Sequence, residues 1–252
     1  MGRQMKRTLH IESNSCAAVD NLGRKTFRME LRGDAGLMHS GQFVDIAVPG
    51  LFLRRPISVC DSSEGSVLIY YKVVGEGTAR LAQMLPGESL DVLVGLGHGF
   101  DPLRCSGKAL LVGGGLGAAP MHLLCRELRS LGRAVTVVLG FNTASEAVLL
   151  DEFCAMGASL HVATMDGSLG VRGLVTDAIP AGEAYDCFYT CGPMVMMKAV
   201  CKALGDIPGQ ASLEERMGCG AGFCYGCSCH TASGTRRICK DGPVFDKEDI
   251  IW

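Results

Sequence analysis

Met217-Gly-Cys-Gly-Ala-Gly-Phe-Cys-Tyr-Gly-Cys-Ser-Cys-His230 is the segment of this 252-residue chain whose chemistry is most constrained. Its first three cysteines, Cys219, Cys224 and Cys227, follow a C-x4-C-x2-C pattern, and Cys239 comes after eleven further residues. Plant-type [2Fe-2S] sites use this spacing of four thiolates. The intervening glycines suit a loop that wraps closely around a cluster, because they lack a Cβ and adopt positive φ readily. The spacing therefore predicts a [2Fe-2S] site on these four cysteines.

A structural zinc site is the alternative for the same segment, since a C-x2-C pair also binds zinc. Its ligands would be Cys224, Cys227, Cys239 and either His230 or Cys229. Zinc accounts neither for the glycines nor for the four-residue gap after Cys219, so the cluster is the preferred interpretation. Cys229 is then a spare thiol. A disulfide is disfavoured because the other cysteines are scattered singly through apolar stretches, which is typical of a reducing cytosol.

Length, charge and apolar segments limit the class of protein. A length of 252 residues favours more than one domain. The formal net charge is −2 and no basic stripe is present, which argues against a nucleic-acid partner. The basic start, Met1 to Arg7, is followed by no apolar segment typical of a secretory signal. Glycines and Pro120 interrupt the most apolar window, 109–125, so no membrane helix is expected. We expect a soluble, cytoplasmic protein.

Residues 1–101 are predicted to form a small antiparallel β-barrel. Short runs rich in Val, Ile, Leu, Phe and Tyr, at 41–48, 66–74 and 89–94, are separated by Gly, Pro, Asp and Ser. Regular short strands of this kind are typical of a barrel. Only residues 79–85 have a helix-like pattern.

Two motifs in the barrel region suit a phosphate-containing ligand. In Arg54-Arg-Pro-Ile-Ser58, a guanidinium and a hydroxyl on one strand are suited to a pyrophosphate and the edge of a flavin ring. Gly77 and Thr78 begin the short helix, and free N–H groups at a helix N-terminus bind anions. Taken alone, the first motif is more often a solvated strand end, and the second is more often a turn with an N-cap.

From 102 to 210, strands and helices alternate, as in a parallel α/β sheet. A buried strand at 108–112 leads into the glycine turn 113–117, and a helix is predicted at 121–131. Such a turn lets the backbone approach a phosphate at the head of the helix. Further strands are predicted at 133–140, 159–163 and 184–190, and further helices at 149–156, 171–179 and 194–204.

Cys191 follows the last of these strands, within the motif Cys191-Gly192-Pro193. Ligands of open α/β sheets bind at the carboxyl ends of the strands, so Cys191 is better placed for a cofactor contact than the other single cysteines. None of the six histidines forms a local pair with a nucleophile, and no nucleophile elbow or metallohydrolase spacing is present. Ordinary acid–base catalysis is not indicated.

In this order, the motifs resemble those of the ferredoxin reductase superfamily, and more closely those of the electron-transfer subunits of NAD-dependent dihydroorotate dehydrogenases. The most specific parts of the resemblance are 54–58, 217–227 and Cys239-Lys-Asp-Gly-Pro-Val-Phe245. The resemblance covers nearly the whole chain. It implies an FAD-binding β-barrel at 1–101, an NAD-binding α/β domain at 102–210 and a [2Fe-2S] segment at 211–252.

The resemblance also implies binding residues. FAD would contact Arg55, Pro56, Ile57, Ser58, Tyr70, Tyr71, Lys72, Gly77 and Thr78. NAD would contact Gly113, Gly114, Gly115, Gly117, Cys191, Gly192 and Pro193, with Cys191 beside the reacting ring as the catalytic candidate. The cluster ligands would be Cys219, Cys224, Cys227 and Cys239. The superfamily often has Tyr where Ile57 stands, so an aromatic contact with the flavin is not implied there. NAD is favoured over NADP because 140–145 offers no Arg or Lys for a 2′-phosphate.

The implied activity is the transfer of electrons from dihydroorotate to NAD in pyrimidine biosynthesis. Dihydroorotate would be oxidised at the FMN of a separate catalytic subunit, and electrons would reach NAD through the cluster and FAD. FAD belongs between them because a nicotinamide exchanges a hydride, a cluster takes one electron, and a flavin handles both. Once the three segments are assigned, no length remains for a catalytic TIM barrel of about 250 residues, so a separate catalytic partner is expected. The resemblance implies a heterotetramer with two copies of each subunit.

Two alternatives remain open. One is a flavin and iron–sulfur subunit of a ferredoxin:NADP reductase, a sulfide dehydrogenase or a hydrogenase complex. The other belongs to a different class and is a non-enzymatic zinc-binding module on a nucleotide-binding scaffold.

Overall fold

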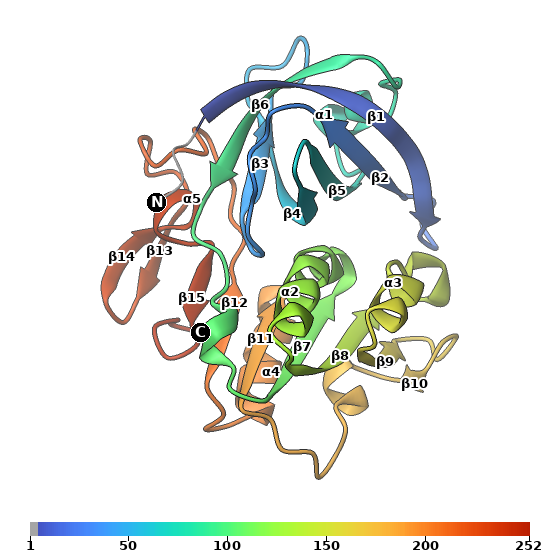
Figure 1. Cartoon of the computed structure of the whole chain (residues 1–252), viewed down its shortest axis with the longest axis vertical. Helices are drawn as coiled ribbons and strands as arrows, with labels where there is room; N and C mark the ends of the chain where they lie inside the picture. Colours follow the sequence, from blue (N-terminus) through green and yellow to red (C-terminus); the bar gives the residue numbers. More distant parts are fainter. Residues whose placement is uncertain (1–4) are drawn as a thin grey trace.

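A closed antiparallel barrel forms the N-terminal part of the computed structural model, which describes residues 5–252 (Figure 1). Its strands are β1 (Met5–Val19), β2 (Lys25–Arg32), β3 (Phe43–Ile46), β4 (Arg55–Ser63), β5 (Ser66–Lys72) and β6 (Ser89–Leu96). They pair in the order β1-β2-β5-β4-β3-β6. The predicted barrel is confirmed. Residues 1–4, which begin the basic N-terminus that is not expected to be a secretory signal, lie outside the described range.

Alternation of buried and partly exposed residues contributes to the barrel core and is strict in β6. In β6, Leu90, Val92, Val94 and Leu96 are buried, whereas the residues between them are partly exposed. Successive side chains of a strand point to opposite faces, so this alternation fills one interior. The short helix α1 (Glu76–Leu81) begins three residues earlier than the predicted range of 79–85, because Gly75 is its N-cap.

A seven-stranded sheet forms the second part of the chain. Its strands, in spatial order, are β10 (Val171–Arg172), β9 (Ser159–Thr164), β8 (Ala134–Phe141), β7 (Lys108–Gly114), β11 (Cys187–Cys191), β12 (Gly209–Ser212) and β15 (Val244–Asp246). All neighbouring strands are parallel except β12 and β15. The chain starts at β7, builds outward through β8 to one edge and then returns to β11. The order therefore reverses beside β7, where such sheets bind ligands.

Helices α2 (Ala118–Ser130), α3 (Leu150–Ala155) and α4 (Met194–Ala203) flank the sheet, and α2 also packs against β4 of the barrel (Figure 1). Short 3-10 helices are η1 (Pro102–Arg104), η2 (Gly115–Gly117), η3 (Ala144–Glu146) and η4 (Val175–Ala178). None of the helices in residues 5–252 is long and apolar enough to cross a membrane.

The predicted helix at 171–179 is wrong. The segment instead forms the edge strand β10 and the single 3-10 turn η4. Gly173 has φ of +138°, outside the helical region, and the Asp177 carboxylate accepts the N–H of Leu174 at 2.7 Å. This contact caps a short turn that ends at Ala178.

The C-terminal segment joins the other two parts. It contains the hairpin β13 (Ser228–Thr231) and β14 (Gly234–Arg237), then helix α5 (Ile238–Asp241), then β15. One buried cluster combines Phe43 and Leu96 of the barrel with Met197 of α4 and Cys227 and Ile238 of this segment. The proposed boundary between residues 210 and 211 falls inside β12, so the three expected domains share a core at this junction.

Candidate functional site: two adjoining pockets and a cysteine loop

The first pocket, named here the barrel pocket, has a volume of about 300 Å³ and lies between the barrel and the sheet. Seven of the expected FAD contacts line it: Pro56, Ile57, Ser58, Tyr70, Tyr71, Lys72 and Thr78. They come from β4, β5 and α1. Residues of the later chain close the opposite wall, including Leu116, Leu213, Glu214 and Glu215. The structure thus brings most of the expected set together around one space.

Arg55 and Gly77 do not line the barrel pocket but contact each other beside it. A Cβ added at Gly77 would lie 2.1 Å from Nε of Arg55, so only glycine leaves room for this guanidinium. Nη1 of Arg55 donates to the carbonyl of Leu53 at 2.6 Å. Thr78 accepts the N–H groups of Val74 and Gly75 at 3.0 and 3.3 Å, and these bonds fix the turn before α1.

The two tyrosines of β5 point to opposite faces of the barrel wall. Tyr71 stacks on Phe27 with ring centroids 5.7 Å apart, and its hydroxyl donates to Oδ1 of Asn14 at 2.9 Å. Tyr70 packs in the core that includes α2. Burial raises the pKa of Tyr70 to about 12, so both hydroxyls are neutral at physiological pH.

The second pocket, named here the sheet pocket, has a volume of about 440 Å³ at the carboxyl ends of β7, β8 and β11. Five of the expected NAD contacts line it: Gly114, Gly115, Gly117, Gly192 and Pro193. A Cβ added at Gly117 would lie 2.1 Å from the carbonyl oxygen of Cys191, so this glycine lets the turn approach the end of β11. The turn and the Cys-Gly-Pro motif thus form one wall.

Gly113 and Cys191 lie behind this wall. A Cβ added at Gly113 would lie 2.9 Å from Leu139, which indicates a packing role. Cys191 is 1% exposed and does not line either pocket. Burial, followed by the nearby charge of Glu214, raises the pKa of the Cys191 thiol. Its assignment as the residue beside the reacting ring stays a prediction.

The two pockets meet at three residues that line both of them, Lys72, Leu116 and Glu214. Glu214 was not identified from the sequence. Its one usable signal is position, since it lies two residues beyond β12, at the carboxyl end of a parallel strand. Glu214 is an exposed residue, and desolvation of its carboxyl group raises its pKa. Among residues 5–252, no basic side chain forms an ion pair with it.

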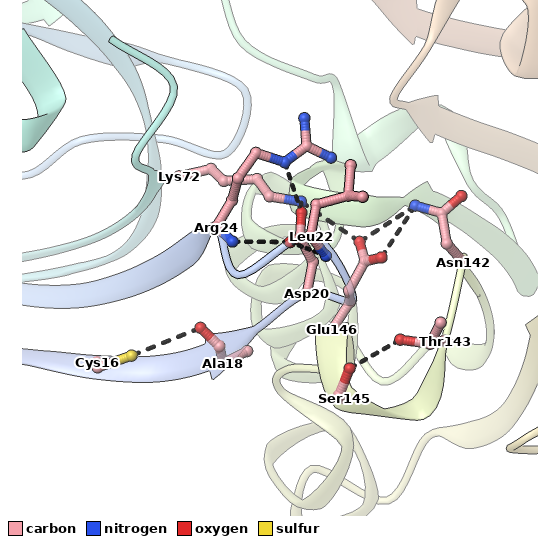
Figure 2. Close-up of polar contacts among 10 residues, drawn as sticks. All are labelled: Cys16, Ala18, Asp20, Leu22, Arg24, Lys72, Asn142, Thr143, Ser145 and Glu146. Carbon is pink, nitrogen blue, oxygen red and sulfur yellow. Dashed lines mark hydrogen bonds and ion pairs between the residues drawn. The ribbon is translucent and has the colours of Figure 1, made fainter. Parts of the chain in front are cut away.

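Lys72 connects the barrel to the sheet at this opening (Figure 2). Its Nζ lies 2.7 Å from Oδ2 of Asp20 in the barrel and 3.4 Å from Oε2 of Glu146 in η3. Burial alone would raise the pKa of Asp20, but hydrogen bonds from Lys72 and Arg24 hold it well below its ordinary value. Glu146 in turn accepts Nδ2 of Asn142 at 3.0 Å. The series Asp20, Lys72, Glu146 and Asn142 is named here the interdomain bridge.

The cysteine loop, residues 219–227, directs backbone N–H groups at sulfur. Cys219 Sγ accepts the N–H groups of Phe223 and Cys224 at 3.2 and 3.4 Å, and Cys227 Sγ accepts that of Cys239 at 3.4 Å. Partial burial alone would raise the pKa of Cys219, but these backbone donors lower it to about 6. A thiolate is therefore favoured at this position, as metal binding requires.

The four predicted ligands lie as two pairs, Cys219 with Cys224 and Cys227 with Cys239. Within residues 5–252, no three or more His, Cys, Asp or Glu side chains gather as ligands of a single metal ion. A binuclear cluster instead takes two protein ligands on each iron, so two pairs fit it. Gly220 and Gly222 have φ of +63° and +84°, as expected for a loop that turns tightly between the two cysteines of the first pair.

Comparison with known proteins agrees with this geometry. Residues 214–251 match the family model of the iron-sulfur cluster binding domain of dihydroorotate dehydrogenase B. The chain is 42% identical to the dihydroorotate dehydrogenase B (NAD(+)) electron transfer subunit of Geobacillus thermodenitrificans, over 91% of this chain and 94% of the relative. It is 38% identical to the protein of the same name from Fusobacterium nucleatum, over 93% and 97%.

Among solved structures, the chain is similar to the NADH-dependent reduced ferredoxin-NADP oxidoreductase described for flavin-based electron bifurcation. The TM-score is 0.87 and the identity 30%, over 97% of this chain and 90% of that one. The identity to the two curated relatives extends over more than 90% of the chain and of each relative. The chain therefore belongs to the family of dihydroorotate dehydrogenase B (NAD(+)) electron transfer subunits.

Proposed function

We propose that this chain is the electron transfer subunit of an NAD-dependent dihydroorotate dehydrogenase of pyrimidine biosynthesis, and thus an oxidoreductase subunit. It passes electrons from the FMN of a catalytic partner through a [2Fe-2S] cluster and FAD to NAD. The observation that carries this proposal is the order of the three sites. The barrel pocket adjoins the sheet pocket at Lys72, Leu116 and Glu214, and Met217, at the start of the cysteine-rich segment, lines the barrel pocket.

FAD is assigned to the barrel pocket. When bound, it exchanges a hydride with a nicotinamide and single electrons with a cluster. The polar residues Ser58 and Thr78 line this pocket, while Pro56 and Ile57 supply an apolar wall. Arg55, held beside Gly77, supplies the positive charge that a pyrophosphate needs.

NAD is assigned to the sheet pocket, with its phosphates at the glycine turn. Gly114, Gly115 and Gly117 leave the backbone bare on this wall, so N–H groups can approach an anion. On the wall opposite, Asn142 and Glu146 present an amide and a carboxylate. Among residues 5–252, no lysine or arginine other than Lys72 lines this pocket, and Lys72 is paired with two carboxylates, which supports NAD over NADP.

The cluster is assigned to Cys219, Cys224, Cys227 and Cys239. The loop that carries the first three is partly open on its outer side, where Phe223 and Tyr225 are 80% and 61% exposed. Electron entry from a partner requires such an exposed side. The family name supports a catalytic partner subunit, and we assign it FMN and a heterotetramer with two copies of each subunit, in the cytoplasm.

A second candidate is a subunit of a ferredoxin-NADP oxidoreductase, favoured by the TM-score of 0.87 to the bifurcating enzyme. The higher identity of 42% to the dihydroorotate dehydrogenase subunit favours the first candidate. Assays with each electron donor would separate the two candidates, because the first uses dihydroorotate and the second uses ferredoxin.

The test is to purify the tagged chain from its native host without oxygen. We expect FAD, two irons per chain and a second chain with FMN, together with reduction of NAD by dihydroorotate. A preparation that contains FAD and iron but reduces NAD only with ferredoxin would support the second candidate. A colourless, zinc-containing preparation would contradict both.

A further inference from the structure

A buried carboxylate of the barrel lies against the cysteine loop. Asp45 is in β3 and only 2% of its surface is exposed. A Cβ added at Gly220 would lie 2.3 Å from Oδ2 of Asp45, so the carboxylate contacts the backbone of this glycine. Gly220 directly follows Cys219 in the chain. The barrel therefore brings a charged side chain to within one residue of a predicted cluster ligand.

The charges of Arg54 and Arg55 favour the ionised form of the Asp45 carboxylate, but neither guanidinium donates a hydrogen bond to it. Its Oδ1 has no hydrogen-bond partner within residues 5–252. Arg54 is nearby, but Nη1 donates to the backbone carbonyl of Asp45 at 3.2 Å and Nη2 pairs with Asp91 at 2.8 Å. Arg55 donates to the carbonyl groups of Leu53 and Arg54 instead.

The neighbouring strands also leave Asp45 without a partner. Its residue opposite on β4 is Pro56, and its residue opposite on β6 is Leu93. Burial raises the pKa of Asp45 to about 6, against the opposing effect of the Arg54 and Arg55 charges. An unpaired charge in such a place costs folding free energy, and an amide or apolar side chain would avoid that cost. The position therefore calls for a functional explanation.

We propose that Asp45 sets the electrostatic environment of the cysteine loop and thereby lowers the reduction potential of the cluster bound there. This inference rests on the proposed function, because it assigns the cluster to Cys219, Cys224, Cys227 and Cys239. Reduction adds an electron to the cluster, and a fixed negative charge nearby opposes that addition. Local charge is one of the factors that set cluster potentials. Asp45 is thus a positioning residue for electron transfer and does not itself react.

The test is an anaerobic redox titration of the isolated chain, carrying cluster and FAD, followed by electron paramagnetic resonance at pH 8. Asp45→Asn keeps the shape of the side chain and removes its charge. We expect the ratio of reduced to oxidised cluster at a given potential to rise about tenfold, which corresponds to a midpoint about 59 mV higher for one electron. The FAD midpoints should move less.

The matched control is Asp151→Asn. Asp151 is an exposed residue of α3, on the side of the molecule away from β13 and β14 (Figure 1). This variant removes the same charge and should leave the cluster midpoint unchanged. Thermal unfolding at pH 8 gives a second measurement, in which Asp45→Asn should be at least as stable as the wild type.

An unchanged cluster midpoint in Asp45→Asn would overturn the proposal. So would a loss of both cluster and thermal stability in Asp45→Asn and in Asp45→Leu, because that result would make the carboxylate a structural acceptor for the loop. Failure of the proposed function looks different, since the wild-type chain would then contain no FAD or no iron, or would reduce NAD only with ferredoxin.

Discussion

At the scale of single residues, Lys72 has the most connected role, because it lines both pockets and pairs with carboxylates of both domains. Asp20 is buried and depends on Lys72 and Arg24 for compensation of its charge. Glu146 has a second donor in Asn142. The two ends of the interdomain bridge therefore differ in how their charge is compensated. Substitutions at Lys72 and at Glu146 should have different effects on stability.

We predict that Lys72→Met lowers the thermal stability of the chain, because it leaves the buried Asp20 carboxylate with only one of its two cations, Arg24. The difference from wild type should be full above the ordinary pKa of an aspartate, near 4, and should shrink at lower pH. The sign follows from the lowered pKa of Asp20, which contributes stability that is lost as the carboxylate is protonated. Unfolding curves between pH 3 and 8 provide the measurement.

Glu146→Gln is the matched control for this variant, because it keeps the pair of Asp20 and Lys72 and removes only the cross-domain charge. We expect stability close to that of the wild type, since a single partly exposed pair contributes about 0–1 kcal/mol. Equal losses of stability in the two variants would show that the cross-domain contact, and not Asp20, is what Lys72 supports.

At Glu214, we predict that Glu214→Gln slows reduction of bound FAD by NADH about 10- to 100-fold, with FAD content unchanged. The carboxyl group lies where the pockets meet, and a small misplacement of reacting groups has an effect of this order. Glu215→Gln is the control, because Glu215 lines only the barrel pocket. Stopped-flow absorbance of the flavin is the measurement, and equal rates in both variants would contradict the assignment.

At the scale of elements, the strands with clear alternation or long apolar runs could be predicted from the sequence, and the glycine turn could be placed before α2. The extent of β1 could not be predicted from the sequence. Its run of polar residues, from Glu12 to Ser15, and two register irregularities obscure the alternation. The stretch 171–179 looked helical because the conformation of Gly173 and the bond from Leu174 to Asp177 are not visible in a pattern of apolar residues.

The start of α1 gives a prediction at this scale. Gly77→Ala should displace Arg55, because the added Cβ would lie 2.1 Å from its Nε, and should weaken FAD binding about tenfold or more. Gly75→Ala is the control two residues earlier, where an added Cβ meets nothing within 4 Å. FAD fluorescence on release gives both affinities. Equal affinities would mean that the position of Arg55 does not matter for the flavin.

At the scale of the whole molecule, the barrel, the α/β sheet and the cysteine loop could be predicted from the sequence, but the contacts that join them could not. Spacing and glycines identified the cysteine loop, because ligand chemistry acts over a few residues. The pairing of β15 with β12, the common core of Phe43, Leu96 and Ile238, and the meeting of the two pockets at Glu214 all depend on contacts between distant segments. No local pattern encodes these contacts, and for this reason Glu214, Asp45 and the interdomain bridge emerged only from the structure.

The cysteine loop and the two pockets are separate sites in the structure. A substitution in the loop should therefore impair electron passage to the partner without impairing the reaction between NADH and FAD. Cys224→Ser removes an exposed thiol of the cysteine loop and leaves the residues of both pockets in place. NADH should therefore still reduce FAD in this variant at close to the wild-type rate, while passage of electrons to or from a partner is lost.

The most direct test is NADH formation from dihydroorotate by the anaerobically reconstituted complex of this chain and its catalytic partner. We expect NADH to form with the wild-type chain and not with the catalytic partner alone. With Cys224→Ser, the rate of NADH formation should fall at least 100-fold, about the loss expected when an essential carrier is removed. NADH formation that needs no electron transfer subunit, or that is unaffected by Cys224→Ser, would contradict the proposed function.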